Sequence, residues 1–299
     1  MNDLDQLPLL TFDDVDVGQD LGTLSYAMTE EKLRHFRSAT GDPGALYPTI
    51  ATKDFYYLLH NRFRVGLMLH AKHDSSYVRP PAPGIQVRVR GRIADKYVRR
   101  GRPLIVVESI SEDDAGQLLV RSRTTFLPLG EGEGGGRSDH GGPGAERPDP
   151  EPAGAGALKP GVVLGPLTRH LTTELMEEFE RCSELIVERP RRESIHVNPD
   201  LARQAGQPAP VASGMHSVAH LGHLLRDALG DAWSNGGHLV VNHVRPLYAG
   251  DELTAHAVVT GVVEGSTGRR LLLDVWCQNA GGYKTTVGSA DVALADLPA

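Results

Sequence analysis

The chain has 299 residues, of which 40% are hydrophobic, and a formal net charge of −7. This composition excludes a wholly disordered protein, and the acidic balance without a long basic run gives no electrostatic footprint for nucleic acid. Only two cysteines occur, Cys182 and Cys277, which is too few for a disulfide framework or a zinc site and favours a reducing, cytoplasmic location. No stretch resembles a signal peptide, and nowhere do 18 apolar residues follow one another, so we expect no membrane span.

Glycine and proline are concentrated in one segment of the chain. Of 34 glycines and 20 prolines, 11 and 5 lie in residues 130–161. This segment has almost no apolar side chains to bury, so it is predicted to be a flexible linker. We therefore expect a first domain at residues 1–129 and a second domain at residues 162–299.

The two stretches that flank the linker begin with the same helix signal. Thr29 is a candidate N-cap that precedes acidic residues and is followed seven residues later by Phe36. Thr172 and Phe179 repeat this spacing in the second stretch. The pattern predicts one short amphipathic helix at the start of each half.

Further matches follow in the same order in both stretches. Residues 78–84 match residues 244–250, and alternating strand patterns follow each of them, at 85–93 and 104–109 and at 252–259 and 271–276. Longer apolar helices are predicted at about residues 50–63 and 215–229. The chain is therefore expected to be a tandem repeat of α+β units, each an antiparallel sheet wrapped around a central helix.

The repeat is unequal in length. Phe36 and Val78 lie 42 residues apart, whereas the equivalent Phe179 and Val244 lie 65 residues apart. The second half thus has about 23 additional residues in a polar segment that contains His196 and precedes the buried helix. Because loops on a rigid scaffold commonly carry chemistry, we expect the functional site in this segment.

Part of this segment is recognisable. The residues Ile195-His196-Val-Asn198-Pro-Asp-Leu-Ala202, followed by Gly206 and then Ser213-Gly214-Met215, resemble the hydratase segment of MaoC-like hot-dog proteins. These are (R)-specific enoyl-thioester hydratases and 3-hydroxyacyl-thioester dehydratases. In the first half, residues 12–18, 39–43 and 77–84 resemble the N-terminal MaoC-like dehydratase domain. The resemblance implies a double hot-dog fold, in which the two halves pair as two single hot-dog subunits would.

The resemblance also implies an activity. It indicates a lyase that interconverts 3-hydroxyacyl and 2-enoyl thioesters of CoA or an acyl-carrier protein, without an organic cofactor or a metal. The resemblance is compatible with a homodimer. A thioesterase, or an isomerase or cyclase of a biosynthetic pathway, on the same scaffold is an alternative. A non-catalytic subunit that binds acyl thioesters is another.

Site residues follow from the resemblance position by position. His196 falls on the family histidine, and Gly214 falls on the helix-start glycine whose amide holds the thioester oxygen. Five residues before this histidine the family has an acidic residue, but this chain has Arg191. Two residues after it, one branch of the family has a carboxylate, but this chain has Asn198. We therefore expect Asn198 or Glu193 to orient a water molecule for His196.

Other candidates surround this core. Arg191, Ser213, Met215, His243 and Arg245 are predicted to bind substrate, with His243 and Arg245 facing a phosphopantetheine phosphate. Ser213 fits equally well as the N-cap of the following helix.

Three further expectations concern residues that the resemblance does not place in the site. Tyr47 replaces the histidine of the first half, which is therefore expected to be non-catalytic. His70 and His73 resemble a metal-binding pair without a third ligand, so we expect no metal. The histidines of the second central helix are expected to pack between the halves; they are His216, His220 and His223.

Overall fold

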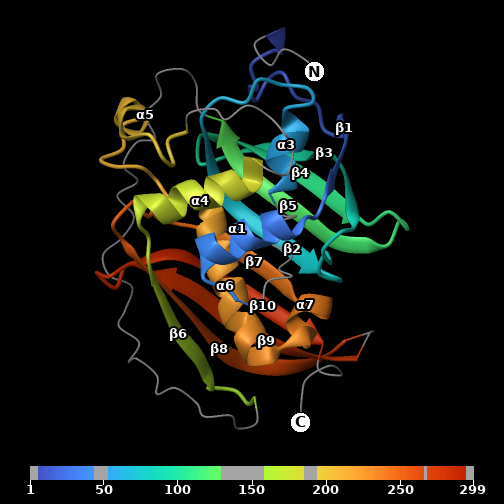
Figure 1. Ribbon diagram of the computed structural model, residues 1–299, viewed down its shortest axis with the longest axis vertical. Coiled ribbons are helices and arrows are strands. Elements are labelled where there is room, and N and C mark those ends of the chain that lie inside the picture. Colours follow the sequence, from blue (N-terminus) through green and yellow to red (C-terminus); the bar gives the residue numbers. More distant parts are fainter. Residues whose placement is uncertain (1–5, 44–52, 129–157, 185–193, 266–267, 294–299) are drawn as a thin grey trace.

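The computed structural model describes residues 6–43, 53–128, 158–184, 194–265 and 268–293. Within them, the strands form one antiparallel sheet in the order β1-β3-β4-β5-β2-β7-β10-β9-β8-β6 (Figure 1). The strands of the first half are β1 (Asp20–Ala27), β2 (Met68–Tyr77), β3 (Gln86–Arg99), β4 (Arg102–Glu112) and β5 (Leu118–Pro128). Those of the second half are β6 (Val163–His170), β7 (His238–His243), β8 (Glu252–Gly265), β9 (Gly268–Gln278) and β10 (Lys284–Ala293).

The strand order is the same when it is traced from either edge of the sheet to the middle. β1 corresponds to β6, and the inner strands correspond in turn until β2 meets β7. The two halves join along this pair, with register from Lys72 opposite Asn242 to Ser76 opposite His238. The predicted tandem repeat of α+β units is therefore confirmed.

The repeat extends to individual hydrogen bonds. The N–H of Gly84 donates to Met28 at 2.7 Å, and the N–H of Gly250 donates to Leu171 at 2.8 Å. Both glycines have positive φ angles, 85° and 95°, a conformation that residues with a Cβ rarely adopt. The two matching sequence segments thus make the same turn in both halves.

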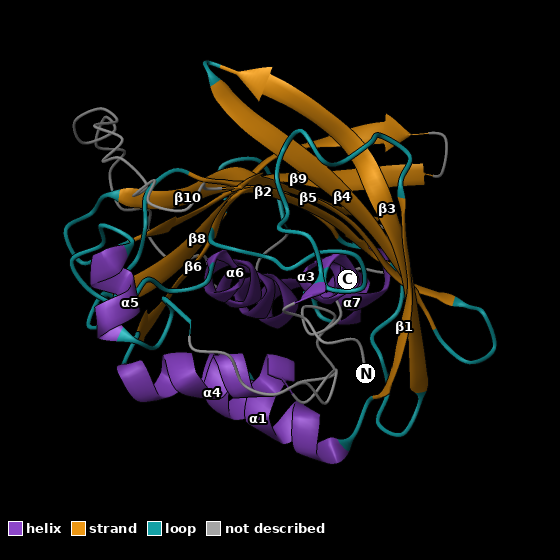
Figure 2. Cartoon of the chain, turned by 90° about the horizontal axis from the view of Figure 1, so that it is seen from above, coloured by secondary structure: helices purple, strands orange, loops and turns teal. Residues whose placement is uncertain are grey.

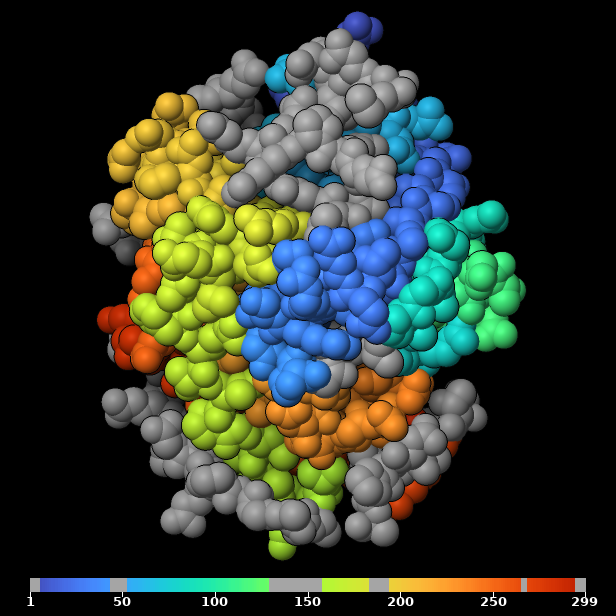
Figure 3. Space-filling view, viewed as in Figure 1, coloured from blue at the N-terminus to red at the C-terminus, as the bar shows by residue number. Residues whose placement is uncertain are grey.

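Two equivalent helices lie side by side across the join. These are α1 (Glu30–Thr40) and α4 (Thr173–Glu184), and each begins at the predicted threonine. Thr29 accepts from the N–H of Lys32, and Thr172 accepts from the N–H of Leu175, both at 3.2 Å. The helices close the open side of the curved sheet, and they adjoin each other at the surface in blue and yellow-green (Figures 2 and 3).

The central helices of the two halves differ. α6 (Gly214–Leu229) has 16 residues, lies inside the curve of the sheet and is buried along most of its length (Figure 2). Its counterpart α3 (Asp54–Leu59) has only six residues. The prediction of a helix over residues 50–63 is wrong about its C-terminal end, because α3 ends at Leu59. Beyond Leu59 the chain turns away and bonds to the N-terminal segment, since Asn61 Nδ2 donates to Leu21 and the N–H of Arg64 donates to Pro8.

Two shorter helices complete the described part of the chain, α5 (Pro199–Gln204) and α7 (Asp231–Gly236). Both cysteines are buried as free thiols. In the described ranges, no helix is long and apolar enough to cross a membrane.

Candidate active site

His196 is fixed by the segment that leads into α6. The N–H of Val211 donates to the carbonyl of Ile195 at 3.1 Å, and Nδ1 of His196 lies 2.6 Å from the carbonyl oxygen of Val211. A carbonyl oxygen only accepts, so Nδ1 carries the hydrogen and Nε2 of the neutral ring keeps its lone pair. The imidazole is thereby held in one orientation by Val211, which lies three residues before α6 begins.

The same segment is tied to the turn at residues 244–250. The N–H of Ala212 donates to Leu247 at 2.8 Å, and the N–H of Ala249 donates to Pro210 at 3.0 Å. Ser213 is the N-cap of α6, and its hydroxyl accepts from the N–H of Met215 at 3.4 Å. These contacts agree with the prediction that Ser213 is the N-cap of this helix.

Gly214 is the first residue of α6. The first N–H groups of a helix have no acceptor within the helix, and the helix dipole makes this end attract negative charge. A Cβ on Gly214 would lie 2.8 Å from Nε2 of His243 and 3.0 Å from Nδ1 of His70. Only glycine therefore fits here without displacing an imidazole.

The histidines beside Gly214 form a buried cluster across the join between the halves. The ring of His70 lies 4.6 Å from that of His243 and 5.4 Å from that of His73, centre to centre. Burial lowers the pKa of His73 to about 3 and that of His243 to about 4. These side chains are neutral at pH 7, and no group of three potential metal ligands is found among the described residues.

The structure thus places His243, which is predicted to face a phosphate, directly beside Gly214. A buried, neutral imidazole packed against Gly214 offers no charge to a phosphate. Sequence spacing showed only His70 and His73 together, because the pairing of β2 with β7 that brings His243 to them is a tertiary contact. The guanidinium of Arg245 lies on the ring of Tyr283, 5.3 Å from its centre, and donates to Lys284.

Two of the predicted catalytic and substrate-binding residues have structural contacts instead. The side-chain oxygen of Asn198 caps α5, accepting from the N–H groups of Asp200 at 2.8 Å and Leu201 at 3.1 Å. An oxygen occupied in this way is not available to orient a water molecule. Met215 is 1% exposed and belongs to the hydrophobic core. Arg191, Glu193 and Tyr47 lie outside the described residues.

An ion pair that the sequence analysis did not predict lies near His196. Nζ of Lys53, at the start of α3, lies 3.1 Å from Oε1 of Glu180 on α4. Only 12% and 17% of these two side chains are exposed. The ammonium group also lies over the ring of Phe179, 4.9 Å from its centre, and that ring lies 4.0 Å from the ring of His216.

The charges of this group interact. Burial would raise the pKa of Glu180, but the charge and hydrogen bond of Lys53, together with electrostatic interactions with His196 and His216, lower it to about 2. Burial lowers the pKa of His216 to about 3, although Glu180 opposes this shift. Glu180 is therefore an anion and His216 a neutral ring at pH 7. No local pattern marked Glu180 or Lys53, because they come from different halves.

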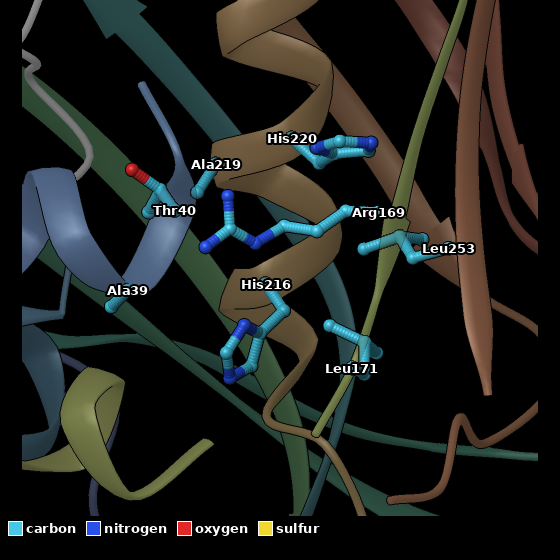
Figure 4. Close-up of a pocket in the computed structure, with 8 residues that line it drawn as sticks. All are labelled: Ala39, Thr40, Arg169, Leu171, His216, Ala219, His220 and Leu253. Carbon is cyan, nitrogen blue, oxygen red and sulfur yellow. The ribbon is translucent and has the colours of Figure 1, made fainter. Parts of the chain in front are cut away.

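A small cavity lies farther along α6, between α1 and β6 (Figure 4). Arg169 extends from β6 across it, and its guanidinium donates to the carbonyl of Ser38 on α1 at 2.8 Å. His220 donates from Nε2 to the carbonyl of Leu167 on β6 at 2.7 Å, a contact within the second half. The cavity is lined by Ala39, Thr40, Arg169, Leu171, His216, Ala219, His220 and Leu253.

The doubled sheet, the buried helix and the two covering helices define a double hot-dog protein. Residues 192–272, which lie in the second half, match the sequence profile of the MaoC like domain family. The matched residues include His196 and Gly214.

Solved structures agree with this fold. A MaoC-like dehydratase superposes with a TM-score of 0.71 at 17% identity, covering 95% of this chain and 99% of that chain. HtdX from Mycobacterium tuberculosis gives 0.59 at 19% identity, covering 91% and 99%. A conserved hypothetical protein of the same organism, described as a double hotdog fold, gives 0.55 at 17% identity, covering 95% and 97%. No curated protein sequence matches the chain.

Proposed function

We propose that this protein is a hydro-lyase that interconverts 3-hydroxyacyl and 2-enoyl thioesters, carried on CoA or an acyl-carrier protein. The observation that carries the proposal is the oriented imidazole of His196. Its Nδ1–H is fixed on Val211, three residues before the amide of Gly214, within a segment that matches the MaoC-like domain. A base and an oxyanion donor on one short segment are the two groups that this reaction needs.

The dehydration direction assigns a step to each group. Nε2 of His196 takes the proton from Cα of the 3-hydroxyacyl thioester, and the negative charge that develops on the thioester oxygen is stabilised by the N–H of Gly214. The electron pair then forms the Cα–Cβ double bond as the bond between Cβ and the hydroxyl oxygen breaks. The imidazolium returns its proton to the departing hydroxyl, which leaves as water. Hydration follows the same steps in reverse.

The direct test is the His196→Ala variant, with His170→Ala as its matched control. His170 is an exposed histidine at the end of β6. With a crotonyl-type thioester, the control is expected to hydrate the double bond at the wild-type rate, followed by the absorbance of the enoyl thioester. Removal of His196 is expected to lower kcat by at least about 100-fold.

A second measurement separates the alternatives. Release of free thiol without loss of the enoyl absorbance would identify a thioesterase and overturn the proposal. Unchanged hydration in His196→Ala would also overturn it, because no other residue is assigned the proton transfer.

A further inference from the structure

The turn between β3 and β4 carries three exposed arginines. Arg99 and Arg102 lie opposite each other as the last cross-strand pair, and Arg100 follows in the turn with a positive φ angle of 53°. In the described ranges none of the three is paired with an acidic side chain, whereas Arg90 on the same strand is paired with Glu112. Like charges on opposite residues of a sheet repel, and side chains rarely adopt positive φ. These residues therefore work against the stability of the hairpin, which favours a role outside the fold.

The repeat supplies an internal comparison. The equivalent hairpin of the second half, between β8 and β9, has Gly265 opposite Gly268 as its last pair. Beside this pair, Glu264 and Arg269 form an ion pair at 3.2 Å. The hairpin fold thus does not require the arginines, and they give the first half a local positive charge in a chain with a formal net charge of −7.

The arginine tip, defined as residues 97–102, projects from the sheet. All six of its residues are exposed, with Val98 at 62% and Tyr97 at 36%. Its base is held by Lys96, whose Nζ donates to the carbonyl of Val15 at 2.6 Å and lies 5.3 Å from the centre of the Phe12 ring. Small ligands bind in concave sites, whereas arginine and tyrosine are enriched at protein interfaces. A projecting, positively charged tip with apolar side chains therefore fits an acidic protein surface.

The tip lies at the same end of the sheet as the proposed site. His70, which is beside Gly214, lies opposite Phe126 on β5. Phe126 lies opposite Ile105 on β4, and Ile105 lies opposite Lys96 on β3. Neighbouring strands are about 4.8 Å apart and residues rise about 3.3 Å along a strand, so the turn lies on the order of 20 Å from His70. A partner on the tip thus reaches the site only through a long arm.

We propose that the arginine tip docks an acidic acyl-carrier protein, which presents its thioester to His196 and Gly214 on a pantetheine arm. This inference rests on the proposed function and selects the carrier protein, rather than CoA, as the carrier of the substrate. The arginines attract the acidic surface from a distance, and Val98 and Tyr97 supply apolar contact once it has docked. The first half, expected to be non-catalytic, thereby supplies the docking surface for the second.

The test removes the three charges and keeps the turn. The triple variant Arg99→Gln/Arg100→Asn/Arg102→Gln places Asn before Gly101, the pair that two-residue hairpin turns favour. With a crotonyl thioester of a bacterial acyl-carrier protein, kcat/KM is expected to fall at least about 10-fold, through KM. With crotonyl-CoA, kcat/KM should stay at the wild-type value. Added salt should lower the wild-type kcat/KM for the carrier-linked substrate more than that of the triple variant.

A matched control removes three exposed arginines elsewhere in the same sheet. The variant Arg88→Gln/Arg121→Gln/Arg123→Gln changes the net charge equally and should keep the wild-type kcat/KM for both substrates. Equal losses with carrier protein and CoA in the tip variant, or no loss with either, would overturn the inference. Binding to vesicles that contain phosphatidylglycerol, lost in the tip variant while turnover on the carrier protein is unchanged, would assign the tip to a lipid surface and also overturn it.

A binding measurement separates this inference from the proposed function. Fluorescence anisotropy of the labelled, crotonyl-loaded carrier protein reports docking without turnover. Binding that the tip variant loses, in a protein that hydrates no enoyl thioester, would support the docking surface and overturn the function. Hydration of crotonyl-CoA by a wild-type protein that neither binds nor hydrates the carrier-linked thioester would support the function and overturn the inference.

Discussion

At the scale of single residues, the proposed site combines His196, which is held by one hydrogen bond, with Gly214, where neighbouring imidazoles leave no room for a Cβ. The sequence motif predicted both His196 and Gly214. It could not predict that His70 and His243 would flank Gly214, since each comes from a different strand. Nor did it show that the side-chain oxygen of Asn198 caps α5, because an asparagine before a proline fits a helix cap and a site residue equally well.

Substitution of Gly214 by alanine tests the close packing at the start of α6. The added Cβ would lie 2.8 Å from Nε2 of His243, so the helix start or the imidazole must shift. We expect a loss of stability of about 1–3 kcal/mol and a fall in kcat of about 100-fold or more. Thermal unfolding and enoyl hydration measure the two effects.

Gly261→Ala is the matched control, because a Cβ at Gly261 meets no atom within 4 Å. Wild-type kcat in Gly214→Ala would show that neither the amide nor its surroundings matter for turnover.

At the scale of secondary-structure elements, the halves are fastened where β2, β7 and β10 lie side by side. His238 on β7 bonds through Nδ1 to Asp291 at 2.9 Å and through Nε2 to Asp74 at 3.0 Å. Lys72 also lies near Asp74, at 3.7 Å, and Arg270 is paired with Asp291. The hydrogen bonds to Asp291 and Asp74 raise the pKa of His238 to about 9.

The stability that His238 confers should therefore depend on pH. Because its folded-state pKa is raised from 6.5 to about 9, its contribution is fully present below about pH 6.5 and disappears as the pH rises through 9. The side chain is 34% exposed, so screening by solvent reduces the contribution to on the order of 1 kcal/mol. Urea unfolding from pH 5.5 to 10 should show His238→Gln less stable than the wild type at pH 6, with the difference vanishing near pH 10. A difference that stayed constant over this range would contradict the assignment of charge to His238.

At the scale of the whole molecule, the two halves are unequal copies that share one sheet. The second half has a long central helix and the segment that we propose to be catalytic, whereas α3 in the first half has six residues and begins next to Lys53. The two halves are joined by the pairing of β2 with β7 and by the packing of α1 against α4. Both contacts are made by residues outside the predicted linker.

The linker predicted at residues 130–161 is consequently expected to act only as a tether. Deletion of residues 138–145 should leave both the unfolding temperature and the rate of enoyl hydration close to those of the wild type. The physical reason is its composition, which is rich in glycine and proline and has almost no apolar side chains to pack. A folded deletion variant without activity would contradict this expectation.

Local sequence signals were enough to predict the repeat, the two capped helices and the α+β class, and the resemblance supplied His196 and Gly214 as candidate site residues. These follow from local signals: the N-cap threonines, the period of the apolar residues, the paired Pro-Gly turns and one motif. Only the tertiary structure brought His70 and His243 to Gly214, and Lys53 to Glu180. Lys53 and Glu180, and His70 and Gly214, are more than 100 residues apart in the chain, and His243 lies on a different element from Gly214. Contacts of this kind leave no periodic pattern in the sequence.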